Sequence, residues 1–444
     1  MEMSVTYEGS VKPFPPVDSL PPFQLSLLDL LAPTTYTPFM FFYPMDHLKR
    51  VKGDQISSHL KVSLSKTLNL FYPLSGRIRD DLLTIGHYNE GATYIETRVK
   101  GNLAAYLKKT DMKSLNQFIP CTPYCQQQDL TVPQVLVQLN IFECGGIVLG
   151  VCLLHKIIDG STASAFFKSW AAIASGSPEK IAHPNFSDAS SNFPAPSLPA
   201  TFFSSIESAY FTEGKCVRRR YVFDASTVSA LQEKAKSKLA GNPTRFQALC
   251  AFIWKHGMKA CRSISDSRKL SAAMPMVNIR SRLDPCLDKH SLGNLFRFPT
   301  TNLTPTDIEA ELCDLAALIR DAIANVNAEN LKGSCGVERS AAIMEQLSQQ
   351  VDFYEKSPHL FAFSSWYTFG FDDVDFGWGK PVWVGVSGEI SGGNRTLDGV
   401  ILKATGKNNS LEAWIMLDEK IMSILEKDPE FLALASLNPN LFTD

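Results

Sequence analysis

The chain has 444 residues, which is too many for one hydrophobic core, since single cores stop growing at roughly 250 to 300 residues. With 45% hydrophobic and 20% charged residues, the composition is that of a globular protein, and we expect two substantial domains. The 43 Lys and Arg residues nearly balance the 45 Asp and Glu residues, and the net charge of −2 argues against nucleic acid or an anionic membrane as a partner. A small-molecule ligand in a cleft between the domains is the better expectation.

The cysteines and the N-terminal residues bear on the compartment. The ten cysteines show no Cys-x-x-Cys spacing and are sparse for this length, which argues against a disulfide framework and against a zinc site. Residues 1–20 lack the basic start and the apolar run of a signal peptide, and no apolar run approaches about 18 residues. We therefore expect a cytoplasmic monomer that holds no metal.

In chain order, the first clear helix is predicted at 54–69. Residues 132–155 alternate between apolar and polar and break at Cys144-Gly145-Gly146, as two antiparallel strands around a turn would. Directly afterwards, apolar residues spaced three to four apart predict a helix with one buried face, formed by Phe166, Phe167, Trp170 and Ile173. His155 therefore lies in a turn between a strand and a helix.

The second half begins after a proline-rich stretch. Five prolines and little apolar periodicity over 177–200 predict a linker between an N-terminal domain at 1–176 and a C-terminal domain at 201–444. Further helices are predicted at 226–238, 244–260, 306–326, 338–350 and 418–427, and strands at 272–278, 360–366, 381–387, 397–404 and 410–417. We interpret the basic run Lys215–Arg220, KCVRRR, as a charged strand end exposed to water.

The stretch LLHKIIDGST at 153–162 contains the first candidate site, His155-x-x-x-Asp159. On this motif alone two interpretations stay open: a buried histidine beside an aspartate that caps the following helix, or a base that faces a cleft. Histidine titrates near neutral pH and is a natural base there, whereas a metal site would require a third protein ligand. The stretch PMVNIRSRLDP offers a cationic partner for Asp159, because Arg280 and Arg282 would lie on one face at the end of a strand.

A second candidate segment, SSWYTFGFDDVDFGWGKPVWVG, is the densest aromatic and glycine run in the chain. By itself, Asp375-Phe376-Gly377-Trp378-Gly379 is equally well explained as a tight aromatic loop. The sequence contains neither a G-x-S-x-G elbow nor a G-x-x-x-x-G-K-[ST] loop, so a serine hydrolase and a Walker nucleotide site are unsupported.

HKIIDG at 155–160, followed by DFGWG at 375–379, resembles the BAHD family of plant acyl-CoA-dependent acyltransferases. Further similar stretches span nearly the whole chain: LSLLDLL at 25–31, YPLSGRI at 72–78, PTRFQALCAFIWK at 243–255, VNIRSR at 277–282 and LGNLF at 292–296. Within the family, VNIRSR and PTRFQALCAFIWK are most similar to the alkaloid O-acetyltransferases. The stretch SLGNLF departs from the malonylating flavonoid branch, which lowers the expectation of malonyl transfer.

The resemblance implies an α/β protein with two chloramphenicol-acetyltransferase-like domains, each a mixed sheet with flanking helices, and an active-site channel at their interface. It also implies that a segment near 365–388 crosses back to the first domain. Among the site residues, His155 matches the family's catalytic base, and Asp159 matches a structural residue paired with the arginine at Arg280. Asp375 and Gly377 match a structural segment away from the chemistry, and Ser364 and Trp366 match the position proposed to hold the oxyanion.

The expected reaction is acetyl transfer from acetyl-CoA, as a co-substrate and not a bound cofactor, to a hydroxyl of a plant specialised metabolite, with an alkaloid favoured. His155 would take the hydroxyl proton in a ternary complex and then protonate the leaving thiolate. Thr244 and Arg245, at the start of a strong helix, are candidates for binding the phosphates of coenzyme A. Malonyl or another acyl donor, transfer to an amine, and a non-catalytic acyl-CoA-binding protein stay open as alternatives.

Overall fold

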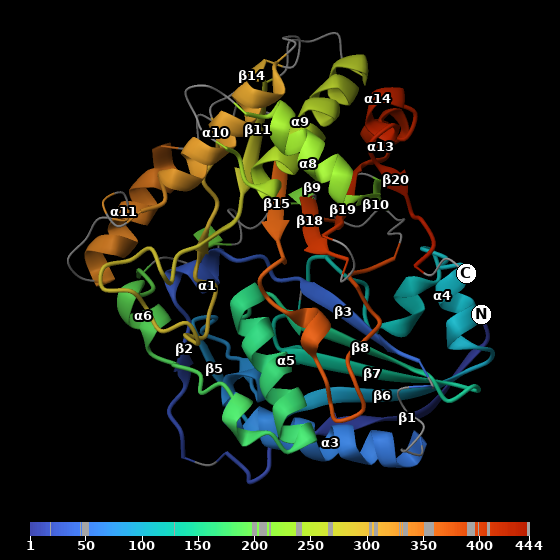
Figure 1. The fold of residues 1–444 in the computed structure, drawn as a ribbon. Coiled ribbons are helices and arrows are strands. Elements are labelled where there is room, and N and C mark those ends of the chain that lie inside the picture. The colour runs from blue at the N-terminus through green and yellow to red at the C-terminus, as the bar shows by residue number, and fades with distance from the viewer. Residues whose placement is uncertain are drawn as a thin grey trace.

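The computed structural model describes residues 1–444 except 18, 45, 47–52, 128, 198–201, 204–210, 213–214, 237–241, 265–269, 302–303, 306–309, 328, 330, 332–335, 350–358, 389–395, 398, 406–408 and 442–444. Two mixed β-sheets, each flanked by helices, make up the lower and upper halves of the molecule in Figure 1. The architecture is therefore the expected two-domain α/β fold, built around two large sheets.

The lower sheet is formed mainly by the first part of the chain. Its strand order is β1 (Met3–Val11), β6 (Ala92–Val99), β7 (Val135–Phe142), β8 (Ile147–Leu154), β3 (Tyr36–Tyr43) and β16 (Trp383–Gly385). All residues of β7 and β8 are buried, as in strands covered on both faces. Helices α3 (Gly53–Leu70) and α5 (Gly160–Ser175) pack side by side against this sheet (Figure 1), and the Trp170 indole N–H donates to Ser63 Oγ at 3.0 Å between them.

The upper sheet has the strand order β14 (Thr304–Pro305), β11 (Leu270–Pro275), β15 (His359–Ser365), β18 (Gly399–Ala404), β19 (Leu411–Asp418), β10 (Cys216–Phe223) and β20 (Ser436–Leu437). Its helices are α8 (Ala225–Lys234), α9 (Arg245–Ile264), α10 (Leu312–Ala324), α13 (Glu419–Leu425) and α14 (Pro429–Leu432). The amphipathic helix α9 buries Trp254, whose indole N–H donates to Ser271 Oγ on β11 at 2.8 Å.

Shorter elements connect and flank the two sheets. They are α1 (Leu27–Leu31), α4 (Leu103–Lys108), α6 (Asp188–Asn192) and α11 (Gly336–Gln349), the strands β2 (Phe23–Gln24), β4 (Arg77–Ile78), β5 (Thr84–Gly86), β9 (Phe211–Thr212), β12 (Val277–Asn278), β13 (Phe296–Arg297) and β17 (Thr396–Leu397), and four 3₁₀ turns at Tyr72–Ser75, Leu115–Phe118, Pro178–Lys180 and Phe371–Asp373. The predicted helices and strands lie within a few residues of their expected positions. The predicted strand 272–278 is divided into β11 and β12, which belong to different sheets.

A strand from late in the chain belongs to the lower sheet. β16 pairs antiparallel with β3, and Trp383 lies opposite Phe42, so residues 383–385 join a strand that precedes them by more than 300 positions. Trp414 and Met416 of β19 pack into the same hydrophobic cluster as the lower sheet. The two halves therefore share a continuous apolar contact.

The interpretation of KCVRRR as a water-exposed strand end is wrong. Residues 216–223 form β10, and Arg218 and Arg220 are only 2% and 3% exposed. The Arg220 guanidinium donates to Glu412 at 3.0 Å, and that of Arg218 lies 4.2 Å from the centre of the Tyr124 ring. Alternate residues of a strand share a face, and here the face carrying the two arginines packs against the lower half of the molecule. Buried partners there take up the Nη groups of both guanidiniums.

Candidate active site

His155 lies directly after the last residue of β8. Its backbone N–H donates to the Thr35 carbonyl at 2.8 Å, which continues the pairing of β8 with β3 by one residue. The imidazole is half-buried, its Nδ1 lies 3.1 Å from Asn294 Oδ1, and its ring meets Phe296 edge to face at 5.9 Å. The strand end therefore holds the backbone, and two residues of the 294–296 stretch hold the ring.

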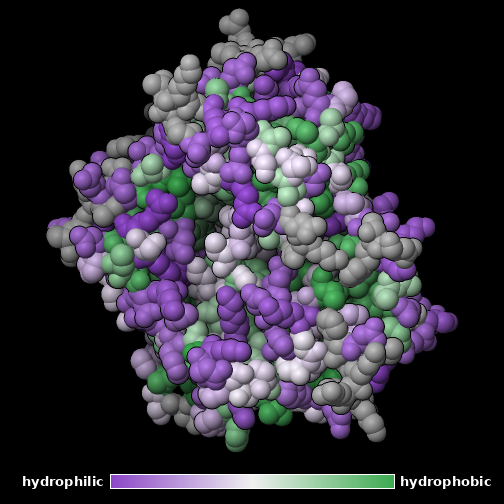
Figure 2. Space-filling view, viewed as in Figure 1, coloured by the Kyte–Doolittle hydropathy of each residue, from purple (hydrophilic) through white to green (hydrophobic). Residues whose placement is uncertain are grey.

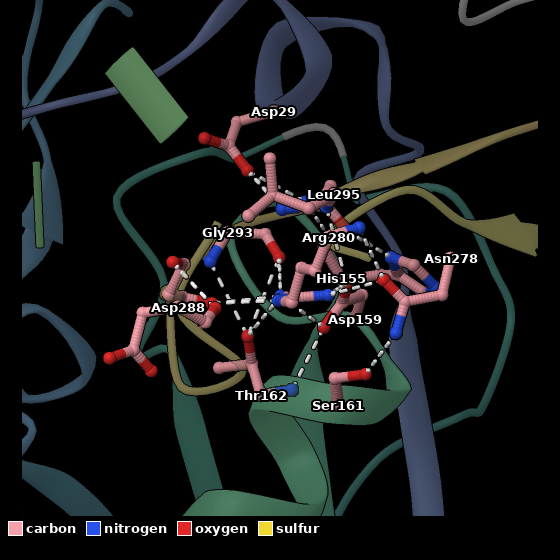
Figure 3. Close-up of polar contacts among 12 residues, drawn as sticks. Asp29, His155, Asp159, Ser161, Thr162, Asn278, Arg280, Asp288, Gly293 and Leu295 are labelled. Carbon is pink, nitrogen blue, oxygen red and sulfur yellow. Dashed lines mark hydrogen bonds and ion pairs between the residues drawn. The ribbon is translucent and has the colours of Figure 1, made fainter. Parts of the chain in front are cut away.

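Asp159 begins α5 as its N-cap. Its Oδ1 accepts a hydrogen bond from the Thr162 N–H at 2.8 Å, and the carboxylate also accepts from the Leu295 N–H at 3.2 Å. Both oxygens face Arg280, with Nη1–Oδ2 and Nη2–Oδ1 distances of 2.7 and 3.1 Å (Figure 3). A bidentate pair of this kind fixes both side chains. The carboxylate is thus committed to the arginine and the helix start, away from the His155 ring nitrogens.

Arg280 lies in the turn after β12, and its partners differ from those of Arg282. Arg280 also donates to the carbonyls of Ser291 and Gly293, at 2.8 and 3.1 Å from Nη2. Arg282 donates to the carbonyls of Ile323 and Val326 at the end of α10. The expectation that both arginines lie on one strand face is wrong, because β12 ends at Asn278, before either of them.

A cavity of about 230 Å³ lies beside His155 between the two sheets. Its wall is formed by Thr37, Phe39, Leu153, His155, Ile158, Asp159, Gly160, Ser161, Ala163, Met276, Asn278, Phe296, Ser364, Ser365, Trp366, Thr368 and Phe369. Among these described lining residues there is no Lys or Arg, and Asp159 is the only carboxylate. On the face drawn in Figure 2, the surface is hollowed left of centre, between the upper and lower halves.

Both predicted oxyanion residues, Ser364 and Trp366, line this cavity. Ser364 lies on β15, and Trp366 directly follows that strand, where its backbone N–H donates to the Leu402 carbonyl at 2.7 Å. The Trp366 ring stacks on Phe39 of β3, with centroids 5.0 Å apart and planes at 18°. This stack places one residue from each sheet on the cavity wall.

Burial acts on the protonation of His155. It lowers the pKa of the imidazole, and the hydrogen bond with Asn294 and the charge of Asp159 oppose this only in part. The neutral ring is therefore the resting form at neutral pH. A neutral imidazole with one free nitrogen at an apolar cavity can accept a proton from a bound hydroxyl.

The remaining predicted residues lie away from the cavity wall. Asp375 Oδ1 accepts from the N–H groups of Gly377 and Gly379, both at 2.8 Å, and Gly377 has φ of +104° and lies near Ser175 at the end of α5. Thr244 and Arg245 begin α9, where Thr244 forms a capping box with Gln247. The Arg245 guanidinium lies 5.9 Å from the Tyr367 ring, next to the cavity residues Trp366 and Thr368.

Two buried residues that support the His155 segment, one directly and one through the other, were not predicted from the sequence. Asn294 is 1% exposed and bonds both the ring and the backbone of His155, and Asp29 is fully buried and bonds Asn294. Both lie in stretches quoted for the family resemblance, LGNLF and LSLLDLL. Contacts across 139 and 265 positions leave no signal in local spacing.

One group of three possible metal ligands occurs among the described residues, namely His256, Asp428 and Glu430. The Lys259 ammonium lies 3.3 Å from Asp428 and 3.1 Å from Glu430. An ammonium therefore already pairs with both carboxylates, and the group lies outside the cavity wall.

The sequence matches a family model and also individual relatives. The model of the family described as Transferase matches residues 1–432. Akuammiline synthase 2 of Alstonia scholaris is 34% identical over 450 residues, covering 100% of this chain and 99% of the relative. Limonoid 7-O-acetyltransferase of Citrus sinensis is 32% identical over 461 residues, covering 99% of each.

Comparison with solved structures gives the same fold. The crystal structure of vinorine synthase superposes with a TM-score of 0.81 at 28% identity, covering 99% of this chain and 100% of that one. TRI101 of F. graminearum, solved with coenzyme A and T-2 mycotoxin, shares the fold with a TM-score of 0.72 at 18% identity, covering 94% and 100%. The two-sheet fold and the match to these relatives identify the chain as an acyltransferase. The chain belongs to the Transferase family, the BAHD acyltransferases.

Proposed function

We propose that this chain transfers an acetyl group from acetyl-CoA to a hydroxyl of a polycyclic plant metabolite, with His155 as the general base. The observation that carries the proposal is the neutral His155 imidazole at a cavity between the two sheets. The described lining holds no Lys or Arg, and its one carboxylate, Asp159, is paired with Arg280. The names of the relatives support transfer to oxygen, since one acts on a limonoid as a 7-O-acetyltransferase. Both alkaloid and limonoid skeletons are large and mostly apolar, as the cavity wall is.

The reaction proceeds in a ternary complex. His155 takes the proton of the acceptor hydroxyl as its oxygen attacks the thioester carbonyl, and the imidazolium then protonates the departing thiolate of coenzyme A. Such proton transfer contributes about 10² to 10⁴ in rate. Asp159 and Arg280 hold the turn that carries the base and take no part in proton transfer.

The tetrahedral intermediate requires hydrogen-bond donors directed at its oxygen. We assign this role to Ser364 or to the Trp366 indole N–H. Both residues line the cavity on its β15 side. A stacked Trp366 is held in place by Phe39, so its N–H direction is set before the substrate arrives. Asp375 and Gly377 act structurally, by closing the loop that precedes β16.

The acyl donor enters as a coenzyme A thioester. A structure of the same fold was solved with coenzyme A. Arg245 at the start of α9 is our candidate for binding its phosphates, with Thr244 already engaged as the helix cap. No cofactor is held permanently.

We propose the cytoplasm as the compartment and a monomer as the working form. No helix in the described ranges is long and apolar enough to cross a bilayer. Nine of the cysteines are free thiols, a state typical of a reducing compartment.

The proposal is tested by following free coenzyme A. The purified protein is incubated with acetyl-CoA alone, and then with a panel of hydroxylated alkaloids and limonoids, and the products are identified by mass spectrometry. We expect thiol release only when an alcohol is accepted, and a loss of at least about 100-fold in kcat for His155→Ala with unchanged thermal melting. Thiol release without acceptor, or a variant that keeps a tenth of wild-type kcat, would contradict the assignment.

A further inference from the structure

The Asn294 side chain can adopt only one amide orientation. Its Nδ2 faces three acceptors, Asp29 Oδ1 at 3.0 Å and the carbonyls of His155 and Lys156, both at 2.9 Å. A flipped amide would place its oxygen against these three oxygens, one of them on a carboxylate. The assignment of amide atoms follows from such networks, and this one fixes Oδ1 toward the His155 ring.

The fixed amide oxygen determines the tautomer of His155. Nδ1 lies 3.1 Å from Asn294 Oδ1, an acceptor without protons, so Nδ1 must carry the hydrogen. Nε2 then has the free lone pair. This is the tautomer that a base requires if Nε2 is the nitrogen at the cavity.

Asp29 holds the amide in turn. It is fully buried in α1, where Oδ2 accepts from the N–H and the hydroxyl of Ser26, and Oδ1 accepts from the N–H and Nδ2 of Asn294, at 2.7 and 3.0 Å. Gly293 makes this approach possible: its φ is +132°, and a Cβ there would lie 3.3 Å from Asp29 Oδ1. Figure 3 shows the Asp29 carboxylate directed toward the 293–295 stretch.

Lys156 forms a second connection between α1 and the turn that carries His155. Its buried ammonium donates to the carbonyls of Leu30 and Ala32, both at 3.0 Å, at the end of α1. Helix α1 is therefore attached to the His155 turn directly and through Asn294. These contacts join an N-terminal helix, the strand end and a loop of the second half around one imidazole.

We propose that Asp29 is a positioning residue for His155, which acts through Asn294 to hold the imidazole in the tautomer with the proton on Nδ1. The inference rests on the proposed role of His155 as the base. In Asp29→Asn the new amide can turn its NH₂ group toward Asn294, and only the carbonyls of His155 and Lys156 then oppose a flip of the Asn294 amide. The flipped amide becomes populated, and its NH₂ group faces Nδ1. Nδ1 must accept in that arrangement, the proton moves to Nε2, and the ring can no longer take a proton from the acceptor there.

The test compares Asp29→Asn with the matched control Ser26→Ala. The control removes a hydrogen bond from the other oxygen of the same carboxylate and leaves the contact with Asn294 in place. We expect Asp29→Asn to lower kcat at least about tenfold with KM for both substrates within about threefold, and Ser26→Ala to lower thermal stability with kcat unchanged. Equal losses of kcat in both variants would show that Asp29 only supports the helix, and would overturn the proposal.

Two further measurements keep the test decisive if Asp29→Asn does not fold. Asn294→Ala should lower kcat by at least about tenfold. Where Asp29→Asn folds, the double variant Asp29→Asn/Asn294→Ala should lose no more than Asn294→Ala alone. A wild-type kcat in Asn294→Ala would overturn the proposal.

¹⁵N spectra of histidine-labelled protein, with His155→Gln used to assign the signal, should report Nδ1–H in the wild type. This readout needs no substrate, so it separates failure of this inference from failure of the proposed function. An Nε2–H signal for His155 in the wild type would overturn the inference.

Discussion

With His155 as the proposed base, its protonation is expected to set the pH dependence of the reaction. Burial lowers the pKa of the imidazole below its ordinary value of 6.5, so the ring stays neutral to lower pH than a free histidine. Activity should be lost as the pH falls through the lowered pKa, because protonation removes the base. The acidic limb of kcat/KM, measured from pH 5 to 8.5, should have its midpoint below 6.5. A midpoint above 6.5 would indicate a different base or a more exposed ring.

Among the individual residues of the site, those that belong to short recognisable motifs could be predicted from the sequence. His155 and Asp159 are four positions apart, and Arg280 lies within the recognisable stretch VNIRSR, so the three could be proposed as a set from sequence. Asn294 and Asp29 could not, because an Asn after a glycine and an Asp in a five-residue helix are ordinary features until the fold brings them together. Their contribution comes from burial and from which atom faces which.

At the scale of elements, one ion pair joins the start of α5 to the turn after β12. Asp159 and Arg280 are 5% and 3% exposed, and removal of either partner leaves a buried charge without compensation. Asp159→Ala and Arg280→Ala should each lower the free energy of unfolding by about 3 to 5 kcal/mol, together with activity. The double variant should be little worse than either single one, as measured by urea unfolding. Additive losses would show that the two side chains stabilise the fold independently.

A second buried ion pair lies where β19 and β10 face β16. Glu412 accepts from the Arg220 guanidinium at 3.0 Å and from the indole N–H groups of Trp414 and Trp383 at 3.0 and 3.2 Å, and Lys403 lies 3.6 Å away. Burial acts to raise the pKa of Glu412, but Lys403 and Arg220 outweigh it and hold the pKa below its usual value. The carboxylate therefore stabilises the fold above pH 4.5, and this contribution is lost as the pH falls through the lowered pKa.

Replacement of Glu412 by Gln should reveal this contribution. We expect Glu412→Gln to lower the free energy of unfolding at pH 7 by about 3 to 5 kcal/mol, because two cations lose their buried partner. The control is Glu426→Gln, which removes the half-buried partner of the adjacent Arg219 and should cost roughly 0 to 1 kcal/mol. If the two variants lose the same stability in urea titrations at pH 7, Glu412 does not stabilise the contact between the halves.

Over the whole molecule, local patterns predicted the elements better than their arrangement. The alternation and turn at 132–155 gave β7 and β8 correctly, since both strands and their hairpin are local. The placement of β16 beside β3, and the burial of Arg218 and Arg220 where the halves meet, depend on partners distant in sequence. A run such as KCVRRR is typical of an exposed strand end. The buried partner of Arg220, Glu412, lies 192 positions later on β19, so nothing near the run in sequence indicates it.

The charge of the whole cavity decides between acyl donors. A malonyl group ends in a carboxylate, which on leaving water requires a cation, most favourably a bidentate arginine. The described lining residues include no Lys or Arg, and Arg280 is already bound to Asp159 by both oxygens. A further cation in the second half of the chain, Arg395 in GGNRTLDG, lies outside the described residues. Acetyl ends in a methyl, which the aromatic wall of Phe39, Trp366 and Phe369 accommodates without a counter-charge.

We therefore expect acetyl-CoA to be preferred over malonyl-CoA by at least about tenfold in kcat/KM, equivalent to roughly 1.4 kcal/mol in transition-state binding. The measurement is a competition at equal concentrations of the two donors with one accepted alcohol, with the ratio of esters read by mass spectrometry. As a control, Ser161→Arg, which adds a cation to the cavity wall, should shift the ratio toward malonyl ester while His155 stays intact. Predominantly malonylated product from the wild type would contradict the expectation, and would indicate that a cation outside the described wall reaches the acyl group.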